Sequence, residues 1–387
     1  PKYVDESNYK VINQKSIRIN GIDESSLKFV SEEFWNNLND NFKIFNGDIL
    51  INSTGTGTLG RSIVFKKLGG NYLADSHVTI FRTRRNLAEP LYINYLLQSE
   101  KGQKAIYTNC VTGSTNQIEL SKDKFDELVL PIPPLYEQQK IATILSIVDE
   151  QIEQTDVLIE KTKELKKGLM QRLLTKGIGH TEFKDTEIGR IPKEWEVKKL
   201  SEIGDIVTGN TPKTSDKKNY GSEYLFVSPA DLGDKKYIES TSKMLSKYGF
   251  EKTRRLPKGS ILVTCIGSTI GKIGIAGKEL CTNQQINSIV CREQYSNEYI
   301  YYAIDFNFWR YESFISAQAV PIINKTVFSG FDIAVPPLDE QIKIASILSE
   351  IDEKIDAYVK KRGYLDVLKN GLMQQLLTGK IRVLVNM

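Results

Sequence analysis

The chain has 387 residues, of which 40% are hydrophobic and 26% charged, and its formal net charge is +4. This composition excludes a disordered chain, the length favours two or three domains, and no run approaches the ~18 consecutive apolar residues of a membrane span. With two histidines (His77 and His180) and no C-x-x-C pair, we expect no bound metal. We place the chain in a reducing cytoplasm and expect mostly buried free thiols at Cys110, Cys265, Cys281 and Cys291.

Residues 1–132 are rich in glycine, asparagine, serine, threonine and aromatic residues, and they predict a β-rich domain. The clearest strand-like run is Gly47-Asp48-Ile49-Leu50-Ile51-Asn52-Ser53. A polar loop with glycines follows it and ends at Gly60-Arg61. A second strand-like run, Leu128-Val129-Leu130-Pro131, closes the segment.

Residues 133–177 predict one long helix. Pro133 and Pro134 suit its first turn, where the missing N–H of proline costs nothing. Apolar positions then recur in alternating steps of four and three, which is the period of a coiled coil. About 40 residues at ~1.5 Å each make a rod of roughly 60 Å. The positions that define this stripe are Ile141, Leu145, Val148, Ile152, Thr155 and Ile159.

Residues 178–335 predict a second β-rich domain that is related to the first. Its run Gly259-Ser260-Ile261-Leu262-Val263-Thr264-Cys265 resembles residues 47–53, and Gly271-Lys272 takes the place of Gly60-Arg61. The segment also ends in a strand-like run that leads to proline, at residues 331–336.

Residues 336–387 repeat the first rod. The sequence PPLYEQQKIATILS at 133–146 returns as PPLDEQIKIASILS at 336–349, and the likeness continues without a gap to Leu376-Leu377-Thr378. Repeats of this length indicate duplicated structural units. Two such rods in one chain most simply pack against each other. The apolar stripe of the second rod is Ile344, Leu348, Ile351, Ile355 and Tyr358.

The order of domain, rod, domain, rod resembles the specificity subunit of type I restriction–modification enzymes. The motif Pro-Pro-Leu-x-Glu-Gln-x-x-Ile-Ala-x-Ile-Leu at 133–145 and 336–348 resembles the entry to that family's helical regions. Ile191-Pro192-Lys193-Glu194-Trp195 resembles the opening of its recognition domains. Such an opening is missing before the first domain, which begins at Pro1, so we expect that domain to be truncated or completed elsewhere.

The resemblance implies an α+β fold in which two β-rich target-recognition domains are separated by two long antiparallel coiled-coil helices with an internal pseudo-two-fold repeat. The regions would be recognition domain 1 at 1–132, spacer helix 1 at 133–177, recognition domain 2 at 178–335 and spacer helix 2 at 336–387. Each domain would read half of a bipartite double-stranded DNA target, and the rods would fix the gap between the halves.

The resemblance also implies partners. Two methyltransferase subunits would dock on the helices and methylate adenine, and a motor-nuclease subunit would join them for cleavage. This chain would then have no catalytic site and no cofactor, because S-adenosylmethionine, ATP and Mg would bind the partner subunits. We expect the docking surface on exposed faces near the starts of the rods, at Glu137, Gln138, Glu340 and Gln341.

Polar loops of the two domains are candidates for DNA contact. Short polar side chains with glycines let a loop approach a groove closely, Asn and Gln can bond adenine, and Lys and Arg bind phosphates. The mildly basic charge permits this partner without proving it. The predicted DNA-binding residues are Asn52, Ser53, Thr54, Thr56, Arg61, Arg82, Arg84, Arg85, Ser114, Thr115, Asn116 and Gln117 in the first domain, and Thr211, Lys213, Thr214, Ser268, Thr269, Lys272, Asn283 and Gln284 in the second.

Alternative functions have weaker support. Residues 55–60 fit the G-x-G-x-x-G of a dinucleotide site with Asp75 for the ribose, but a strand-like run follows where a helix is needed. The Pro-Pro pairs lack the polar residue of an adenine methyltransferase motif. The Glu-x-Lys of a nuclease occurs at Glu164-Leu165-Lys166, but on a charged helical face where such pairs are common. No Walker loop is present for binding ATP. A coiled-coil scaffold that binds only protein stays open, and salt-dependent DNA binding would distinguish it.

Overall fold

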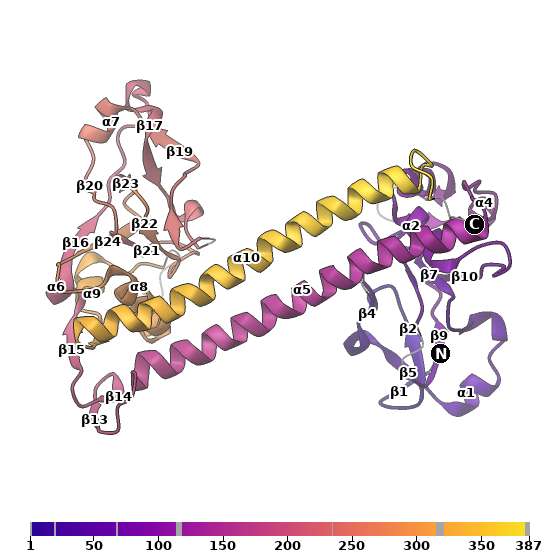
Figure 1. The fold of residues 1–387 in the computed structure, drawn as a ribbon, viewed down its shortest axis with the longest axis horizontal. Coiled ribbons are helices and arrows are strands. Elements are labelled where there is room, and N and C mark those ends of the chain that lie inside the picture. The colour runs from indigo at the N-terminus through magenta and orange to yellow at the C-terminus, as the bar shows by residue number, and fades with distance from the viewer. Residues whose placement is uncertain are drawn as a thin grey trace. The chain divides into compact units, whose positions relative to one another are not determined.

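The computed structural model describes residues 2–18, 21–66, 69–113, 118–233, 235–314 and 321–383. The chain divides into two compact units, which we call unit 1 (Pro1–Ile159 with Tyr358–Met387) and unit 2 (Glu160–Ala357). Each unit combines a β-rich domain with part of both long helices, α5 (Leu135–Lys176) and α10 (Leu338–Leu376) (Figure 1). The predicted class, two β-rich domains that alternate with two long helices, is confirmed.

The domain of unit 1 contains two main sheets. One has the order β1-β5-β2-β9-β6 and the other the order β10-β7-β8. The central strand β7 is buried at all four residues, as its unbroken apolar run Ile49-Leu50-Ile51 requires. The strands are β1 (Tyr3–Val4), β2 (Tyr9–Ile12), β3 (Ile17–Arg18), β4 (Gly21–Ile22), β5 (Lys28–Val30), β6 (Lys43–Ile44), β7 (Ile49–Asn52), β8 (Ser62–Val64), β9 (Asn71–Ala74), β10 (Val78–Phe81), β11 (Val111–Thr112) and β12 (Glu119–Leu120), and the helices are α1 (Glu32–Asn36), α2 (Pro90–Gln98), α3 (Glu100–Ala105) and α4 (Lys122–Asp126).

The domain of unit 2 is built on the same plan with longer strands. Its main sheets have the orders β16-β24-β21-β22-β18 and β19-β17-β23-β20. Both domains contain a parallel pair among antiparallel strands, β2 with β9 and β17 with β23, and unit 2 has a second parallel pair, β18 with β22. The strands are β13 (Phe183–Thr186), β14 (Gly189–Pro192), β15 (Glu196–Lys199), β16 (Gly204–Thr208), β17 (Tyr220–Val227), β18 (Tyr237–Ile238), β19 (Lys243–Leu245), β20 (Arg255–Leu256), β21 (Ile261–Thr264), β22 (Ile273–Ala276), β23 (Leu280–Thr282), β24 (Ile286–Cys291) and β25 (Asp332–Val335), and the helices are α6 (Leu200–Ile203), α7 (Lys247–Glu251), α8 (Asn297–Asn307) and α9 (Lys325–Ser329).

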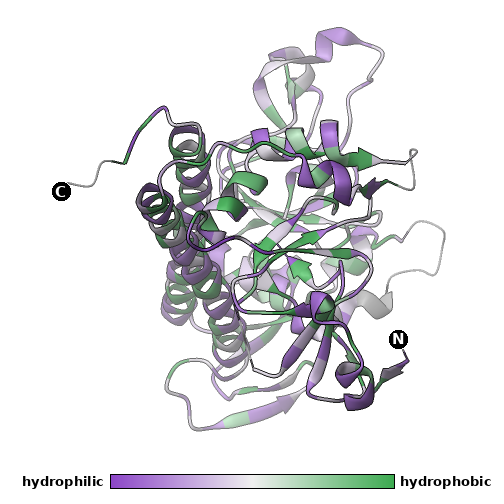
Figure 2. Cartoon of the chain, turned by 90° about the vertical axis from the view of Figure 1, so that its right-hand side faces the viewer, coloured by the Kyte–Doolittle hydropathy of each residue, from purple (hydrophilic) through white to green (hydrophobic). Residues whose placement is uncertain are grey.

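The long helices bury the stripe that their sequence predicts. All six stripe positions of α5, from Ile141 to Ile159, are buried, and so are Ile344, Leu348 and Ile351 of α10, whereas Ile355 and Tyr358 are half-buried. Hydrophilic residues predominate on the rest of both helices, whereas apolar residues concentrate on the strands of the domains (Figure 2). The predicted second helical region is helical only from Leu338 to Leu376, because Gly379 at φ 70° ends the helical path, so residues 377–383 are not part of the rod.

Ion pairs fix the two helices antiparallel within each unit. In unit 1, Lys369 binds Asp149 at 2.7 Å and Arg362 binds Asp156 at 2.8 Å, so a step of seven residues along α5 matches a step of seven back along α10. In unit 2, Lys166 of α5 binds Asp352 of α10 at 2.6 Å, and just past the end of α5 the Ile178 amide donates to Glu340, near the start of α10, at 2.8 Å. Antiparallel packing is therefore confirmed in both units.

Each domain is fastened to the long helices by an equivalent tyrosine. In unit 1, Tyr95 of α2 donates to Asp149 at 2.6 Å, and in unit 2, Tyr302 of α8 donates to Asp352 at 2.6 Å. Both aspartates are also the ion-pair partners named above. Burial raises the pKa of both hydroxyls, with a further rise from the aspartate, so the tyrosines stay protonated donors.

The predictions of buried thiols are confirmed for Cys110, Cys265 and Cys281, and Cys291 is half-buried. Burial raises the pKa of Cys265 and Cys291 to about 12, so these thiols are unreactive at neutral pH. Among the described residues, no group of histidines, cysteines and carboxylates could hold a metal, and no helix combines the length and apolar character needed to cross a membrane.

Candidate nucleic-acid interface

A compact loop at residues 53–60 connects β7 to β8 in unit 1. Its ends are closed by two hydrogen bonds, from the Asn52 amide to the Arg61 carbonyl and from the Gly60 amide to the Asn52 carbonyl, both at 2.9 Å. Gly55 and Gly60 have φ values of 98° and 79°, which only glycine adopts readily. A strand follows the glycines, so the helix that a dinucleotide site requires is not there.

An equivalent loop at residues 265–271 connects β21 to β22 in unit 2. The Thr264 amide donates to the Lys272 carbonyl at 2.8 Å, and the Gly271 amide donates to the Thr264 carbonyl at 3.0 Å. Gly267 and Gly271 have φ values of 101° and 94°. The likeness between residues 47–53 and 259–265 therefore continues into loops of the same backbone design. We call residues 53–60 and 265–271 the paired loops.

Two predicted DNA-binding residues lie buried where β7 enters the first paired loop. Asn52 and Ser53 are 0% and 4% exposed, and this burial argues against the predicted contact with bases. Asn52 donates its amide to the Gln14 carbonyl at 3.1 Å, and Ser53 shares a 2.6 Å hydrogen bond with Thr79. Thr56 is exposed, whereas Thr54 and Arg61 are half-buried.

The three arginines that follow β10 differ from one another. Arg82 binds the buried carboxylate of Asp48 at 3.1 and 3.2 Å, and Arg85 donates to the Asn46 carbonyl at 2.6 Å. Both guanidinium groups therefore hold the turn before β7, which argues against the predicted phosphate contact. Arg84 is exposed and has no side-chain partner among the described residues. The predicted residues Ser114, Thr115, Asn116 and Gln117 lie outside the described residues.

Three predicted segments of unit 2 meet at one end of its sheets. Thr211 donates to the side chain of Gln284 at 2.5 Å, which joins the segment after β16 to the turn after β23. Gln285 of that turn donates to the Ile266 carbonyl at 3.4 Å, which joins it to the paired loop. Each predicted residue of this domain is exposed or half-buried, namely Thr211, Lys213, Thr214, Ser268, Thr269, Lys272, Asn283 and Gln284.

The corresponding end of unit 1 contains polar residues that the sequence analysis did not select. Thr54 donates to Gln14 at 2.8 Å and lies 3.1 Å from Nδ1 of His77, so three distant segments meet here too. Ser76 and His77 are exposed in the turn after β9. The available signal was the position of this turn directly after a short strand, equivalent to residues 283–285 after β23.

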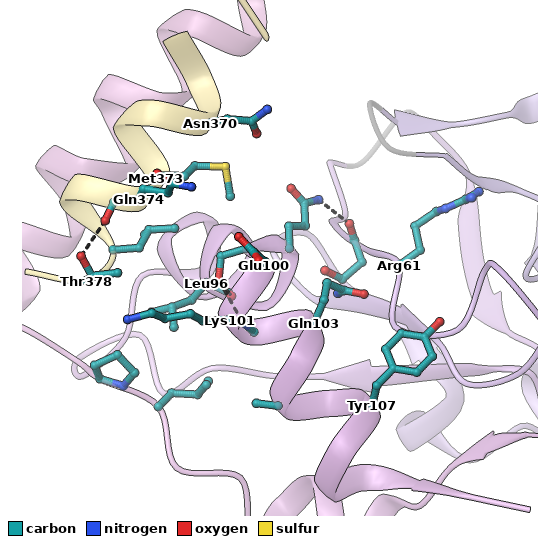
Figure 3. A pocket seen from close by; sticks show the side chains of 18 of the residues that line it. Arg61, Leu96, Glu100, Lys101, Gln103, Tyr107, Asn370, Met373, Gln374 and Thr378 are labelled. Carbon is teal, nitrogen blue, oxygen red and sulfur yellow. Dashed lines mark hydrogen bonds between the residues drawn. The ribbon is translucent and has the colours of Figure 1, made fainter. Parts of the chain in front are cut away.

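A groove of about 1210 Å³ lies behind the first paired loop, between α3 and the end of α10 in unit 1 (Figure 3). Its walls support the loop. Gln103 donates to the Gly60 carbonyl at 3.0 Å, and Tyr107 donates to the Leu59 carbonyl at 3.2 Å. The loop is thus held in one conformation from behind, while Thr56 stays exposed.

The predicted exposure of the docking residues at the helix starts is wrong, since three of the four are buried and Glu340 is half-buried. Glu137, Gln138 and Gln341 are 2%, 0% and 1% exposed. Gln138 accepts from the Glu89 amide at 2.9 Å, and Gln341 accepts from the Ser296 amide at 2.9 Å. Each glutamine thereby ties the start of a long helix to the start of a domain helix, α2 or α8.

The two glutamates hold the chain that leaves the other long helix. In unit 1, both oxygens of Glu137 accept from Arg382, at 2.8 and 2.7 Å. In unit 2, Glu340 accepts from the Ile178 amide at 2.8 Å and from Nε2 of His180 at 2.9 Å. The negative charges of both glutamates are already paired or hydrogen-bonded inside the chain, which argues against the predicted docking role of these residues.

Known proteins share this architecture. The sequence matches the family described as "Type I restriction modification DNA specificity domain" twice, over residues 4–163 and 192–362. A putative type I restriction enzyme specificity subunit, MjaX of Methanocaldococcus jannaschii, is 29% identical over 98% of this chain and 88% of its own length. The HindI specificity subunit of Haemophilus influenzae is 23% identical over 87% of this chain and 86% of its own length.

Solved structures support the fold. The S subunit of a type I restriction–modification system from M. genitalium superimposes with a TM-score of 0.59, at 16% identity over 97% of this chain and 90% of that one. A chain from a type I restriction–modification complex gives a TM-score of 0.55, at 18% identity over 96% of this chain and 92% of that one. With two family matches and relatives along its whole length, this chain belongs to the type I restriction–modification specificity subunits, which read DNA sequence and leave catalysis to their partner subunits.

Proposed function

We propose that each domain of this chain reads one half of a bipartite DNA target, through the paired loop and the polar segments beside it. The observation that carries the proposal is the repetition of one closed, glycine-bearing loop in both domains, each next to a polar turn. A duplicated reader is what a target with two halves requires, since each half needs its own set of donors and acceptors.

The exposed side chains fit base and phosphate contact. Thr56 in unit 1 and Thr211, Ser268 and Gln284 in unit 2 carry hydroxyl or amide groups that can bond base edges. Arg61, Arg84, Lys213 and Lys272 would bind phosphates and set the register. The half-buried or exposed Thr54, Thr214, Thr269 and Asn283 complete the proposed set.

We further propose the division of labour in the complex. Two methyltransferase subunits would use S-adenosylmethionine to methylate adenine in the target, and a motor-nuclease subunit with ATP and Mg would cut unmodified DNA. In this proposal residues 1–132 and 178–335 form the two domains that recognise DNA. The helical regions 133–177 and 336–387 set the gap between the two half-sites.

Single-molecule methylation sequencing of a host genome, with and without this gene, tests the proposal. We expect a split adenine-methylation motif with a fixed gap that disappears when the gene is deleted. Survival of every methylated motif would overturn it, provided that the gene and its methyltransferase partner are expressed in that host. Salt-dependent binding of duplex DNA by the purified complex separates a DNA reader from a scaffold that binds only protein.

A further inference from the structure

The turn at residues 75–77 is fastened into unit 1 by three hydrogen bonds. The Asp75 amide donates to the Ile12 carbonyl at 3.0 Å, and the Ser53 amide donates to the His77 carbonyl at 2.9 Å. The side chain of Asp75 accepts from the His77 amide at 2.9 Å, which sharpens the turn. The turn therefore lies directly beside the first paired loop.

The turn at residues 283–285 is fastened into unit 2 by the same three bonds. The Asn283 amide donates to the Val227 carbonyl at 3.0 Å, and the Cys265 amide donates to the Gln285 carbonyl at 2.8 Å. The side chain of Asn283 accepts from the Gln285 amide at 3.0 Å. By backbone position, Ser76 is equivalent to Gln284 and His77 is equivalent to Gln285, although the residue types differ.

The third residue of each turn also braces its paired loop. His77 contacts the side chain of Thr54 at 3.1 Å, and Gln285 donates to the backbone of Ile266 at 3.4 Å. Thr54 and Ile266 are themselves equivalent, since each forms an isolated bridge, with Glu119 and Ile322 respectively. The two turns thus occupy the same position in their domains, and each one supports the paired loop beside it.

We propose that Ser76 and His77 determine the base specificity of the first domain, at the position that Gln284 and Gln285 occupy in the second. This inference rests on the proposed function and names which residues of unit 1 carry it. Both side chains are exposed, whereas Asn52 and Ser53, which the sequence favoured for this role, are buried.

The hydrogen-bond chain favours one tautomer of His77. Thr54 gives its one hydroxyl proton to Oε1 of Gln14 at 2.8 Å, so its oxygen can only accept from Nδ1 of His77. In the neutral imidazole the proton then sits on Nδ1, and Nε2 is an acceptor with no partner among the described residues. An outward acceptor pairs with a base that presents a donor, the adenine N6 or cytosine N4 amino group, and it disfavours the O6 of guanine and O4 of thymine.

Methylation sequencing of cells that carry the full complex with single substitutions tests this inference. His77→Ala and Ser76→Ala should relax one or two positions in one half of the motif, with discrimination reduced about tenfold, the size of one good base contact. The other half should stay unchanged. Gln284→Ala, as the matched variant of the second domain, should relax positions in the opposite half only. Glu33→Gln, an exposed change on α1, should alter neither half.

An intact motif for both Ser76→Ala and His77→Ala, with a relaxed half for Gln284→Ala, would overturn the inference and leave the proposed function standing. Relaxation of both halves by His77→Ala would also overturn it, because that result indicates a general loss of stability. If His77→Ala abolishes methylation altogether, Ser76→Ala decides the question, since among the described residues only His77 of this turn is hydrogen-bonded to the side chain of Thr54. The proposed function itself fails only if no motif depends on the wild-type gene.

Discussion

The indole N–H of Trp195 donates to Oε2 of Glu340 over 3.0 Å, and through this bond the start of α10 holds the entrance of the second domain. Trp195 is fully buried. Because the same carboxylate accepts from Ile178 and His180, one side chain fixes the whole connection between α5 and β15. The tryptophan of the Ile-Pro-x-x-Trp opening therefore has a defined structural task.

Glu340→Gln should destabilise the protein by about 1–3 kcal/mol, since an amide cannot accept from all three donors and leaves at least one unsatisfied. Urea unfolding of the purified protein measures the effect. Glu353→Gln, an exposed change on the same helix, serves as the control and should stay within about 0.5 kcal/mol of wild type. Equal stability of the two variants would contradict the assigned role.

Stability should fall in acid, and Glu137 should account for part of the loss. The hydrogen bonds from Arg382 hold the pKa of Glu137 below the ordinary value of 4.5, against an opposing effect of burial. A folded-state pKa below the unfolded value means that this stabilisation is complete above pH 4.5 and disappears as the pH falls through the folded-state pKa.

The pH dependence of the unfolding free energy, compared between wild type and Glu137→Gln, checks that assignment. We expect a shallower decline below pH 4.5 in the variant. Parallel curves for the two proteins would show that Glu137 is not the group that titrates.

Two glycines at the ends of the long helices should respond differently to alanine. Gly177 and Gly379 both have positive φ, 64° and 70°, so either substitution should cost about 1 kcal/mol from backbone strain. A Cβ at Gly177 would also lie 2.5 Å from Oε1 of Glu340 and 2.8 Å from the Trp195 ring, whereas at Gly379 nothing lies within 4 Å. Gly177→Ala should therefore cost a further ~1–3 kcal/mol. Denaturant midpoints of the two variants compare them directly, and equal shifts would refute the crowding.

Tyr95→Phe and Tyr302→Phe should each cost about 1–2 kcal/mol, because each removes a donor to an aspartate that also serves an ion pair. The repeat predicts similar losses for the two. Tyr364→Phe, at a side chain that is 75% exposed, is the matched control and should have no measurable effect. Thermal unfolding provides the comparison, and a loss confined to one tyrosine would show that the two joints differ.

Arg84→Ala should weaken binding of the complex to any duplex to a similar degree and lower the slope of log affinity against log salt by about one. Its folding stability should not change. Arg82→Ala should instead reduce stability, since it leaves the carboxylate of Asp48, only 5% exposed, without its ion-pair partner. A titration of one fixed duplex at several salt concentrations, with unfolding curves of both variants, distinguishes the roles. An unchanged salt slope for Arg84→Ala would remove this residue from the interface.

The sequence was sufficient for the architecture because periodicity and duplication are properties of the chain itself. The stripe from Ile141 to Ile159 is buried as its spacing predicts, and the shared run at 47–53 and 259–265 forms equivalent strands. Side-chain roles at the joints depended on distant partners instead. Glu137 sits in a polar stretch typical of an exposed helix start, yet Arg382, far along the chain, covers it.

The candidate site was predictable only in part, for a related reason. Polarity and glycine content identified the paired loops, but the same features did not reveal that Asn52 faces Gln14 inside the domain. The turn at Asp75, Ser76 and His77 shares only one chemical feature with Asn283, Gln284 and Gln285, a first side chain that caps the turn. Equivalence of this kind is encoded in backbone hydrogen bonds, which three residues of sequence do not specify.

The ion pairs along α5 and α10 constrain how the gene can change. In unit 1 the chain advances seven residues along α5 from Asp149 to Asp156, and it advances seven along α10 from Arg362 to Lys369. An insertion or deletion in one of these stretches puts either pair out of alignment unless the other stretch changes by the same number of residues. Two codon tracts more than two hundred positions apart must therefore lengthen or shorten together to keep both ion pairs, so a length variant that preserves them requires two coordinated mutations where a single helix would require one.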